Sequence, residues 1–223
     1  MDYILIGSGG LASEVVDCLL AQQEAGGELV RIIGMVNDSQ DLFDEQNSRY
    51  RFEAVYLGSI DSHQYDRKFG YIIAFSDIKR RKQLLLDLLL ADYHLPTVIH
   101  PSVSIPKGSS IGTGCVIGPY AVIGRNVSIG VGNIITAYSV LSHDCRVGSF
   151  NFLSTVGLAG QAQLGDENFF GIRSTVLPNI VVGNRNTVQA GMMVDSHVGD
   201  DTTVFYRFKE KLHVQLTKVR GDL

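Results

Sequence analysis

The 223-residue sequence predicts two domains of different class, a small α/β domain over residues 1–97 and a parallel β-helix over residues 98–223. Two observations carry this prediction. Up to Pro96, short apolar runs that end in turn residues alternate with segments of helical spacing, which is typical of a small parallel α/β domain. From Ile99 onward an apolar residue recurs every six positions, which indicates hexapeptide coils.

The elements of the first domain follow from its apolar periodicity. In chain order we expect a strand over 2–6, a helix over 11–20, a strand over 30–36, a polar loop over 37–51, a strand over 71–75 and a helix over 78–93. Asp77 is expected to cap the last helix, and Pro96 to stop it.

The second domain is defined by fifteen apolar positions in two regular runs. They are Ile105, Ile111, Ile117, Ile123, Ile129, Ile135, Leu141, Val147 and Leu153, then Leu164, Phe170, Val176, Val182, Val188 and Val194. The eleven-residue gap between the runs is one residue short of two repeats. Each position should point inward and stack on its counterpart one coil away, about 4.8 Å along the axis. Three such columns predict about five coils, with Gly and Asn at corners that branched residues resist.

Composition excludes several classes of protein. The sequence has 19 Lys and Arg against 23 Asp and Glu, a net charge of −4 without basic runs, so no nucleic-acid partner is expected. The most apolar stretch, Leu84 to Leu90, contains Asp87 and is far shorter than the roughly 20 residues that span a bilayer. Cys18, Cys115 and Cys145 form no CxxC pair. We therefore expect a cytoplasmic protein without membrane insertion.

A glycine-rich turn follows the first strand, over Gly7-Ser8-Gly9-Gly10-Leu11-Ala12. Such a turn lets backbone N–H groups approach an anion at a helix N-terminus, but Ala12 replaces the third glycine of G-x-G-x-x-G. A tight structural turn explains it equally well. Asp38 and the pair Ser76-Asp77 follow the next two strands, where ligands of α/β sheets usually lie. Asp38 also fits a solvated turn residue.

The two halves together resemble the NeuD/PglD-like sugar acyltransferases, over roughly residues 3–198. The motifs that carry the resemblance are the glycine turn, Ile99-His100-Pro101-Ser102, Val140-Leu141-Ser142-His143-Asp144-Cys145, Phe170-Gly171-Ile172 and Val176-Leu177-Pro178-Asn179. The resemblance implies a Rossmann-like N-terminal domain, a left-handed β-helix and a homotrimer with active sites at subunit boundaries. It also implies a nucleotide-linked amino sugar, such as a 4-amino-4,6-dideoxy sugar, as acceptor and acetyl-CoA as donor.

The resemblance also implies roles for individual residues. His143 would be the general base, Asp144 its orienting acid, and the Gly160 N–H the donor to the acetyl carbonyl. The nucleotide part would be bound by Gly7, Ser8, Gly9, Gly10, Leu11, Asp38, Ser76 and Asp77, and acetyl-CoA by Gly160, Gly171, Ile172, Ala190 and Gly191. The sequence departs from the family at its end, where Val204 to Lys209 replace a Gly-x-Pro-Ala-Lys segment. Arg207, Lys209 and Lys211 fit either CoA phosphates or a charged tail.

The chemistry of these residue types suits acyl transfer to an amine. Imidazole is mostly neutral at cytosolic pH yet accepts a proton, and a carboxylate on its other nitrogen fixes the tautomer. N-acetylation is favoured over O-acetylation of a sugar or sialic acid because the His-acid segment most resembles that of amino-sugar enzymes. A hydroxyl acceptor would also demand a stronger base or a metal. Purely structural roles are the alternatives: His143 also fits a solvated corner residue, and Cys145 fits a packed small residue.

Two other classes of function fit the same two domains. A zinc hydratase needs three clustered imidazoles. His143 and His197 are 54 residues apart, three coils or about 14 Å along the axis, and no third histidine is in register, so no metal is expected. The remaining alternative is a non-catalytic trimer that binds a nucleotide sugar and releases no CoA thiol.

Overall fold

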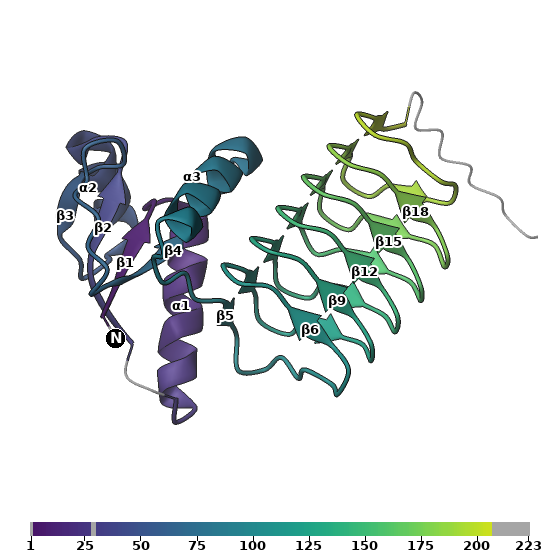
Figure 1. Cartoon of the computed structure of the whole chain (residues 1–223), viewed down its shortest axis with the longest axis horizontal. Coiled ribbons are helices and arrows are strands. Elements are labelled where there is room, and N and C mark those ends of the chain that lie inside the picture. Colours follow the sequence, from purple (N-terminus) through teal and green to yellow (C-terminus); the bar gives the residue numbers. More distant parts are fainter. Residues whose placement is uncertain (1, 28–29, 207–223) are drawn as a thin grey trace, which may run out of the picture.

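The computed structural model describes residues 2–27 and 30–206, and its first part is an α/β unit. Its elements are β1 (Asp2–Ile6), α1 (Gly10–Glu24), β2 (Arg31–Asn37), α2 (Gln40–Tyr50), β3 (Tyr56–Ser59), β4 (Gly70–Ile73) and α3 (Ile78–Leu90). The strands form one parallel sheet in the order β3-β2-β1-β4 (Figure 1). The three predicted strands and both predicted helices are present, and Asp77 caps α3 by accepting the Arg80 N–H at 2.9 Å.

The predicted polar loop over 37–51 is wrong, because most of it forms α2. Ser39 caps this helix by accepting the Leu42 N–H at 3.2 Å, and Arg51 ends it in the left-handed region with a φ of 55°. Only Phe43 of the helix is buried, so the segment lacks the apolar stripe by which a helix is usually found. The strand β3 was not predicted either.

Alternation of side chains along β1 supplies two apolar cores, one on each face of the sheet. Leu5 lies with Ala12, Val15 and Leu19 of α1 on one face. Ile4 and Ile6 lie with Leu85 and Leu88 of α3 on the other. The sheet is therefore covered on both faces, and its strand ends are left to form a site.

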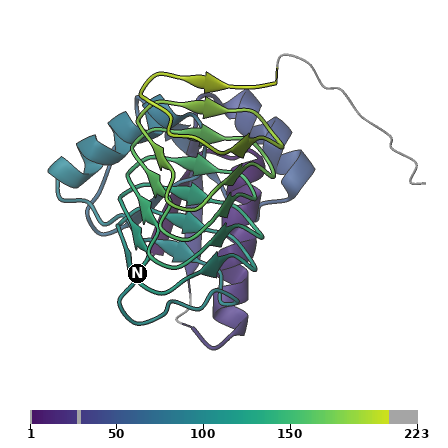
Figure 2. The same cartoon turned by 90° about the vertical axis from the view of Figure 1, so that its right-hand side faces the viewer.

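The second part is a stack of two-residue strands in three parallel sheets, here called the first, second and third faces (Figures 1 and 2). The first face contains β5 (Val98–Ile99), β7 (Val116–Ile117), β10 (Ile134–Ile135), β13 (Phe152–Leu153), β16 (Phe169–Phe170), β19 (Thr187–Val188) and β21 (Thr203–Val204). The second contains β8 (Val122–Ile123), β11 (Val140–Leu141), β14 (Gly157–Leu158), β17 (Thr175–Val176) and β20 (Met193–Val194). The third contains β6 (Ser110–Ile111), β9 (Ser128–Ile129), β12 (Arg146–Val147), β15 (Gln163–Leu164) and β18 (Val181–Val182).

The six-residue period is confirmed along these faces. The predicted inward residues from Ile117 to Val194 are buried in one continuous core, and Ile111 is partly buried against it. Ile105 is a correction, since its side chain is 40% exposed. It lies in no strand, and the second face begins only at β8, which pairs with β11 alone among the described strands, so Ile105 does not join that stack. The missing residue of the gap lies between β13 and β14, where Val140 pairs with Gly157, 17 residues on.

Buried asparagines form a ladder inside the corner that joins the third face to the first. The members are Asn133, Asn151, Asn168 and Asn186, all 1% exposed or less. The side-chain oxygen of each accepts the backbone N–H of the next, at 2.8 Å, 2.9 Å and 2.8 Å along the series. The ladder therefore ties consecutive coils together at their interior.

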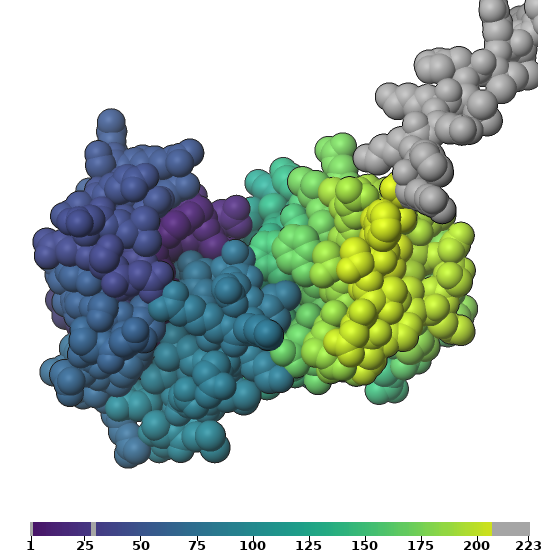
Figure 3. Space-filling view, turned by 90° about the horizontal axis from the view of Figure 1, so that it is seen from above, coloured from purple at the N-terminus to yellow at the C-terminus, as the bar shows by residue number. Residues whose placement is uncertain are grey.

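The α/β unit packs directly on the β-helix (Figure 3). Val98 and Val116 of the first face share the core of α1. Arg81 of α3 is 2% exposed and donates to the carbonyls of Gly132 at 3.1 Å, Gly114 at 2.7 Å and Ile73. Burial lowers the pKa of Arg81 to about 10. The unit thus covers the first face and the corner before it.

None of the helices in the described parts of the chain is long and apolar enough to cross a membrane.

Candidate functional site

All eight residues predicted to bind a nucleotide line one pocket of about 330 Å³ in the α/β unit. The pocket lies at the carboxyl ends of β1, β2 and β4. Gly7 is required there, because it has a φ of 108° and a Cβ would lie 2.8 Å from the Ala74 carbonyl oxygen. Around Gly9 a Cβ would meet nothing within 4 Å, so its backbone is open to the pocket.

The floor of this pocket suits an anion. The helix α1 begins at Gly10 without a side-chain cap and without an acidic residue in its first turn. Its first N–H groups therefore keep their partial positive charge for a ligand. The buried Ser8 side chain is fixed by Asn37, whose Nδ2 donates to the Ser8 Oγ at 2.6 Å.

Arg80 also lines the pocket and was missed by the sequence analysis. Its guanidinium forms a two-point ion pair with the Asp38 carboxylate, and Nη1 lies 3.0 Å from Oδ2. The hydrogen bonds from Arg80 hold the pKa of Asp38 below its usual value. An arginine three residues after Asp77 is visible in the sequence. That Arg80 reaches Asp38, however, depends on the strand order, in which β2 and β4 flank β1.

His143 lies at the corner between the second and third faces. Its Nδ1 is 2.8 Å from Asp144 Oδ2, and Asn126 Nδ2 donates to Asp144 Oδ1 at 3.1 Å. Both hydrogen bonds lower the pKa of Asp144, and the one from His143 has the larger effect. Since the ionised carboxylate accepts, Nδ1 carries the hydrogen and Nε2 is left as the proton acceptor.

Gly160 takes the same corner position as His143 one coil further along, since Leu141 pairs with Leu158. A Cβ on Gly160 would lie 2.8 Å from both Cε1 and Nε2 of His143. The imidazole therefore lies over bare backbone. Within the described chain, no backbone hydrogen bond engages the Gly160 N–H. A proton acceptor and a free backbone donor thus lie side by side.

The other residues predicted to bind acetyl-CoA lie at a different corner, between the first and second faces. Gly171 packs on Ala190, because a Cβ on Gly171 would lie 2.5 Å from the Ala190 N. Ile172, next to Gly171, is exposed. One chain therefore brings Gly160 to His143, but leaves Gly171, Ile172, Ala190 and Gly191 on the far edge of the second face.

The nucleotide pocket and His143 also lie apart within one chain. The α/β unit covers the first face and the corner that precedes it, through Val98 and Arg81. The corner of His143 joins the other two faces and so lies across the triangular coil from the first face. One chain alone therefore does not bring the nucleotide pocket and the His143–Asp144 pair together.

Other predicted details are settled by burial. Cys145 is fully buried, as its packing interpretation requires, and burial raises the pKa of its thiol. Phe170 is in the core, whereas Phe169 is exposed and stacks on Phe152. His197 accepts the Val181 N–H at 3.0 Å.

Residues 2–27 and 30–206 contain no group of three His, Cys, Asp or Glu side chains arranged to hold a metal. The cluster Arg207, Lys209 and Lys211 lies outside the described residues.

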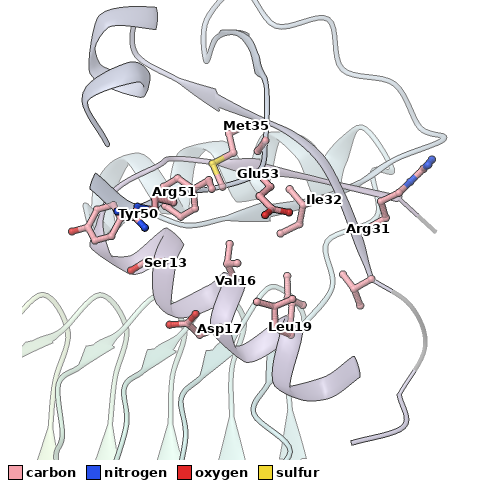
Figure 4. A pocket seen from close by; sticks show the side chains of 14 residues that line it. Ser13, Val16, Asp17, Leu19, Arg31, Ile32, Met35, Tyr50, Arg51 and Glu53 are labelled. Atoms are coloured by element: carbon pink, nitrogen blue, oxygen red, sulfur yellow. The ribbon is translucent and has the colours of Figure 1, made fainter. Parts of the chain in front are cut away.

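A second, larger pocket of about 460 Å³ lies between α1 and residues 50–54 (Figure 4). Val16, Asp17 and Leu19 face it from α1, and Glu53 from the opposite wall. None of the residues predicted to bind ligand lines it. Its lining is largely apolar and also includes Asp17, Arg31, Arg51 and Glu53.

Comparison with known proteins finds likeness in solved structures. No protein-family model matches the sequence, and no curated protein does. The acetyltransferase domain of PglB from Neisseria gonorrhoeae has a TM-score of 0.75 and 20% identity, covering 91% of this chain and 95% of that one. A point mutant of perosamine N-acetyltransferase from Caulobacter crescentus, in complex with CoA and GDP-perosamine, has a TM-score of 0.74 and 23% identity, covering 91% and 92%. WeeI from Acinetobacter baumannii has a TM-score of 0.69 and 19% identity, covering 91% and 96%.

These neighbours and the three parallel sheets fit a left-handed β-helix. At identities of 19% to 23% the likeness establishes the fold: this chain has, over nearly its whole length, the fold of the PglB acetyltransferase domain and of perosamine N-acetyltransferase.

Proposed function

We propose that this protein is an acetyl-CoA-dependent N-acetyltransferase that acts on the amine of a nucleotide-linked amino sugar. The observation that carries the proposal is the His143–Asp144 dyad, whose free Nε2 lies beside the bare backbone of Gly160. The fold adds support, since perosamine N-acetyltransferase has it and is described with CoA and GDP-perosamine.

In the proposed reaction the sugar amine attacks the thioester carbonyl while His143 Nε2 takes its proton. Asp144 holds the ring and stabilises the imidazolium that forms. The Gly160 N–H meets the oxyanion, a contact typically worth about 3–4 kcal/mol. The C–N bond forms, the C–S bond breaks, and the imidazolium returns its proton to the departing sulfur. The products are the amide and free CoA thiol.

The nucleotide part is proposed to lie in the pocket of the α/β unit, with its phosphates at the glycine turn. The strand order β3-β2-β1-β4 supports a Rossmann-like domain, because doubly wound nucleotide-binding sheets begin with the same order. We propose the domain division at 1–97 and 98–223. Gly7 to Leu11 would meet the phosphates, and the side chains at the ends of β2 and β4 would meet the nucleoside.

We also propose that the active unit is a homotrimer. The pocket and the dyad of one chain lie on different sides of the coil, so a second copy is needed to bring one of each together. The outer row of the second face supports this, because Val122, Val140 and Met193 are all exposed there. A closed ring would bury that row and bring Gly171, Ile172, Ala190 and Gly191 of one chain toward Gly160 of the next.

Substitution of Val140 tests the trimer. A carboxylate in the buried row is costly, so V140D should yield monomers in size-exclusion chromatography with light scattering. The matched control is Q163D, an exposed position in the outer row of the third face, which should remain trimeric. A wild-type monomer, or a V140D trimer, would contradict the assembly proposed.

The activity is tested by thiol release from acetyl-CoA against a panel of nucleotide-linked 4-amino sugars, GDP-linked and UDP-linked. His143→Ala should lower turnover by roughly 10²–10⁴ on the preferred sugar. His197→Ala is the matched control, a second β-helix histidine that should leave turnover nearly unchanged. Near-normal turnover of the His143 variant would overturn the assignment. Ligand binding without thiol release would indicate the non-catalytic trimer, and release only with hydroxyl acceptors would indicate O-acetylation.

A further inference from the structure

The Asp38–Arg80 ion pair is part of the lining of the nucleotide pocket. Asp38 follows β2, and Arg80 lies in the first turn of α3, which follows β4. In the sheet, β2 and β4 flank β1 on its two sides. A side-chain pair between them therefore crosses above the end of β1, where the glycine turn begins.

The charges of the pocket conflict with an anionic ligand while this pair is closed. Its charged lining consists of Asp38, Asp77 and Arg80. Asp77 is engaged in capping α3 through the Arg80 N–H, and the Arg80 guanidinium is neutralised by Asp38. A diphosphate at the glycine turn would thus meet two carboxylates without a free cation. The pocket suits that ligand only if the guanidinium changes partner.

The pair is built so that it can open. The Arg80 and Asp38 side chains are 41% and 49% exposed, and water competes well for an ion pair this open. The guanidinium also lies over the Phe75 ring, 5.6 Å from its centroid. This second contact keeps the charge at the pocket when the carboxylate leaves.

We propose that Arg80 and Asp38 part when a nucleoside diphosphate binds, and that Arg80 thereby selects diphosphate-linked ligands over the nucleoside alone. The guanidinium turns to the phosphates, which it can hold at two points, and the freed Asp38 carboxylate accepts hydrogen bonds from ribose hydroxyls. Arg80 is thus a specificity-determining residue. The inference rests on the proposed nucleotide-sugar function and adds to it the residue that recognises the phosphates.

The test is calorimetric binding of GDP and UDP, of guanosine and uridine, and of inorganic pyrophosphate to the full chain. Arg80→Gln should weaken the preferred nucleoside diphosphate and pyrophosphate by at least about tenfold, the loss of a charged hydrogen-bond pair. The affinity for the nucleoside should stay equal or rise, because Asp38 is released. The matched control is Lys79→Gln, an exposed neighbouring cation on α3 outside the pocket lining, which should change neither affinity.

A second variant separates ligand recognition from a structural role. Asp38→Asn frees Arg80, so it should keep or strengthen pyrophosphate binding while it weakens nucleoside binding. A merely structural pair predicts instead that Arg80→Gln and Asp38→Asn change every affinity in the same direction, and that result would overturn the inference.

The remaining outcomes distinguish this inference from the function on which it rests. A wild type that binds nucleoside diphosphate no better than Arg80→Gln does would overturn only the role of Arg80. A wild type that binds no nucleotide and no pyrophosphate would overturn both the role of Arg80 and the proposed nucleotide pocket.

Discussion

The glycine pocket and the His143 corner differ in how much of a site one chain supplies. The pocket is concave because three parallel strands end side by side, and its eight predicted residues meet there. The dyad lies on a convex corner of the coil, where the His143 side chain is 64% exposed. The end of an α/β sheet thus makes a site unaided, whereas a β-helix corner needs a second surface to enclose its chemistry.

The largest effect is expected where the two regions are joined, at Arg81. Arg81→Met would leave the carbonyls of Ile73, Gly114 and Gly132 buried without a donor. An unsatisfied buried group costs about 1–3 kcal/mol, so the free energy of unfolding should fall by at least about 3 kcal/mol. Urea unfolding measures the change. The neighbouring Arg80→Met, at an exposed site, should stay within about 0.5 kcal/mol of wild type, and equal losses in both variants would refute the difference between them.

A substitution at Gly160 should break the corner and leave the pocket intact. In Gly160→Ala the new Cβ would lie 2.8 Å from His143 Cε1 and Nε2, so the ring must move. A displacement of about 1 Å can cost roughly 10²-fold in rate, and we expect a loss of that size in kcat with nucleotide affinity unchanged. Gly199→Ala is the control, since a Cβ there meets nothing within 4 Å. Equal kcat in both alanine variants would show that the ring does not depend on the bare backbone.

The smallest effect is expected from Asp144→Asn. The variant keeps the shape of the side chain and removes the charge that stabilises the imidazolium. Since this carboxylate is exposed, we expect a loss of roughly tenfold in kcat, well below the about 10⁴ known for a buried triad aspartate.

The pH dependence of that loss checks its cause. The hydrogen bond from His143 lowers the pKa of Asp144, so the carboxylate is ionised throughout the neutral range and loses its charge only as pH falls through that lowered value. The Asp144 carboxylate should therefore add no titration of its own to the ratio of wild-type to Asp144→Asn activity between pH 6 and pH 8. A ratio that changes across this range would point to a different titrating group.

The β-helix could be predicted residue by residue, and the α/β unit only in outline. Each coil touches its neighbours in the same way, so one inward position fixes the next six residues on. The prediction is wrong for Ile105 because the strands of the second face begin only at β8, after this residue. The helix α2 was not predicted, because it is defined by its caps at Ser39 and Arg51 rather than by an apolar stripe.

The candidate site divides in the same way. The residues of the glycine pocket could be named in advance, because strand ends meet at one edge of a parallel sheet. The role of Arg80 depends on the strand order, which apolar periodicity does not reveal. Likewise, the spacing of His143 and Gly160 follows from the coil period, whereas any approach of Ile172 to them depends on a second chain.

The hydrogen bonds of the asparagine ladder all run in the same direction along the coil stack, from each coil to the next. The side-chain oxygen of each asparagine accepts a backbone N–H of the coil above, and the Asn186 oxygen accepts the Thr202 N–H at 2.7 Å. The oxygens of Asn133 and Asn151 also accept the Nδ2 of the next asparagine, each at 3.0 Å. A duplicated coil that carried its own asparagine would extend the series without disturbing any rung below it. The ladder itself therefore sets no upper limit on the number of coils.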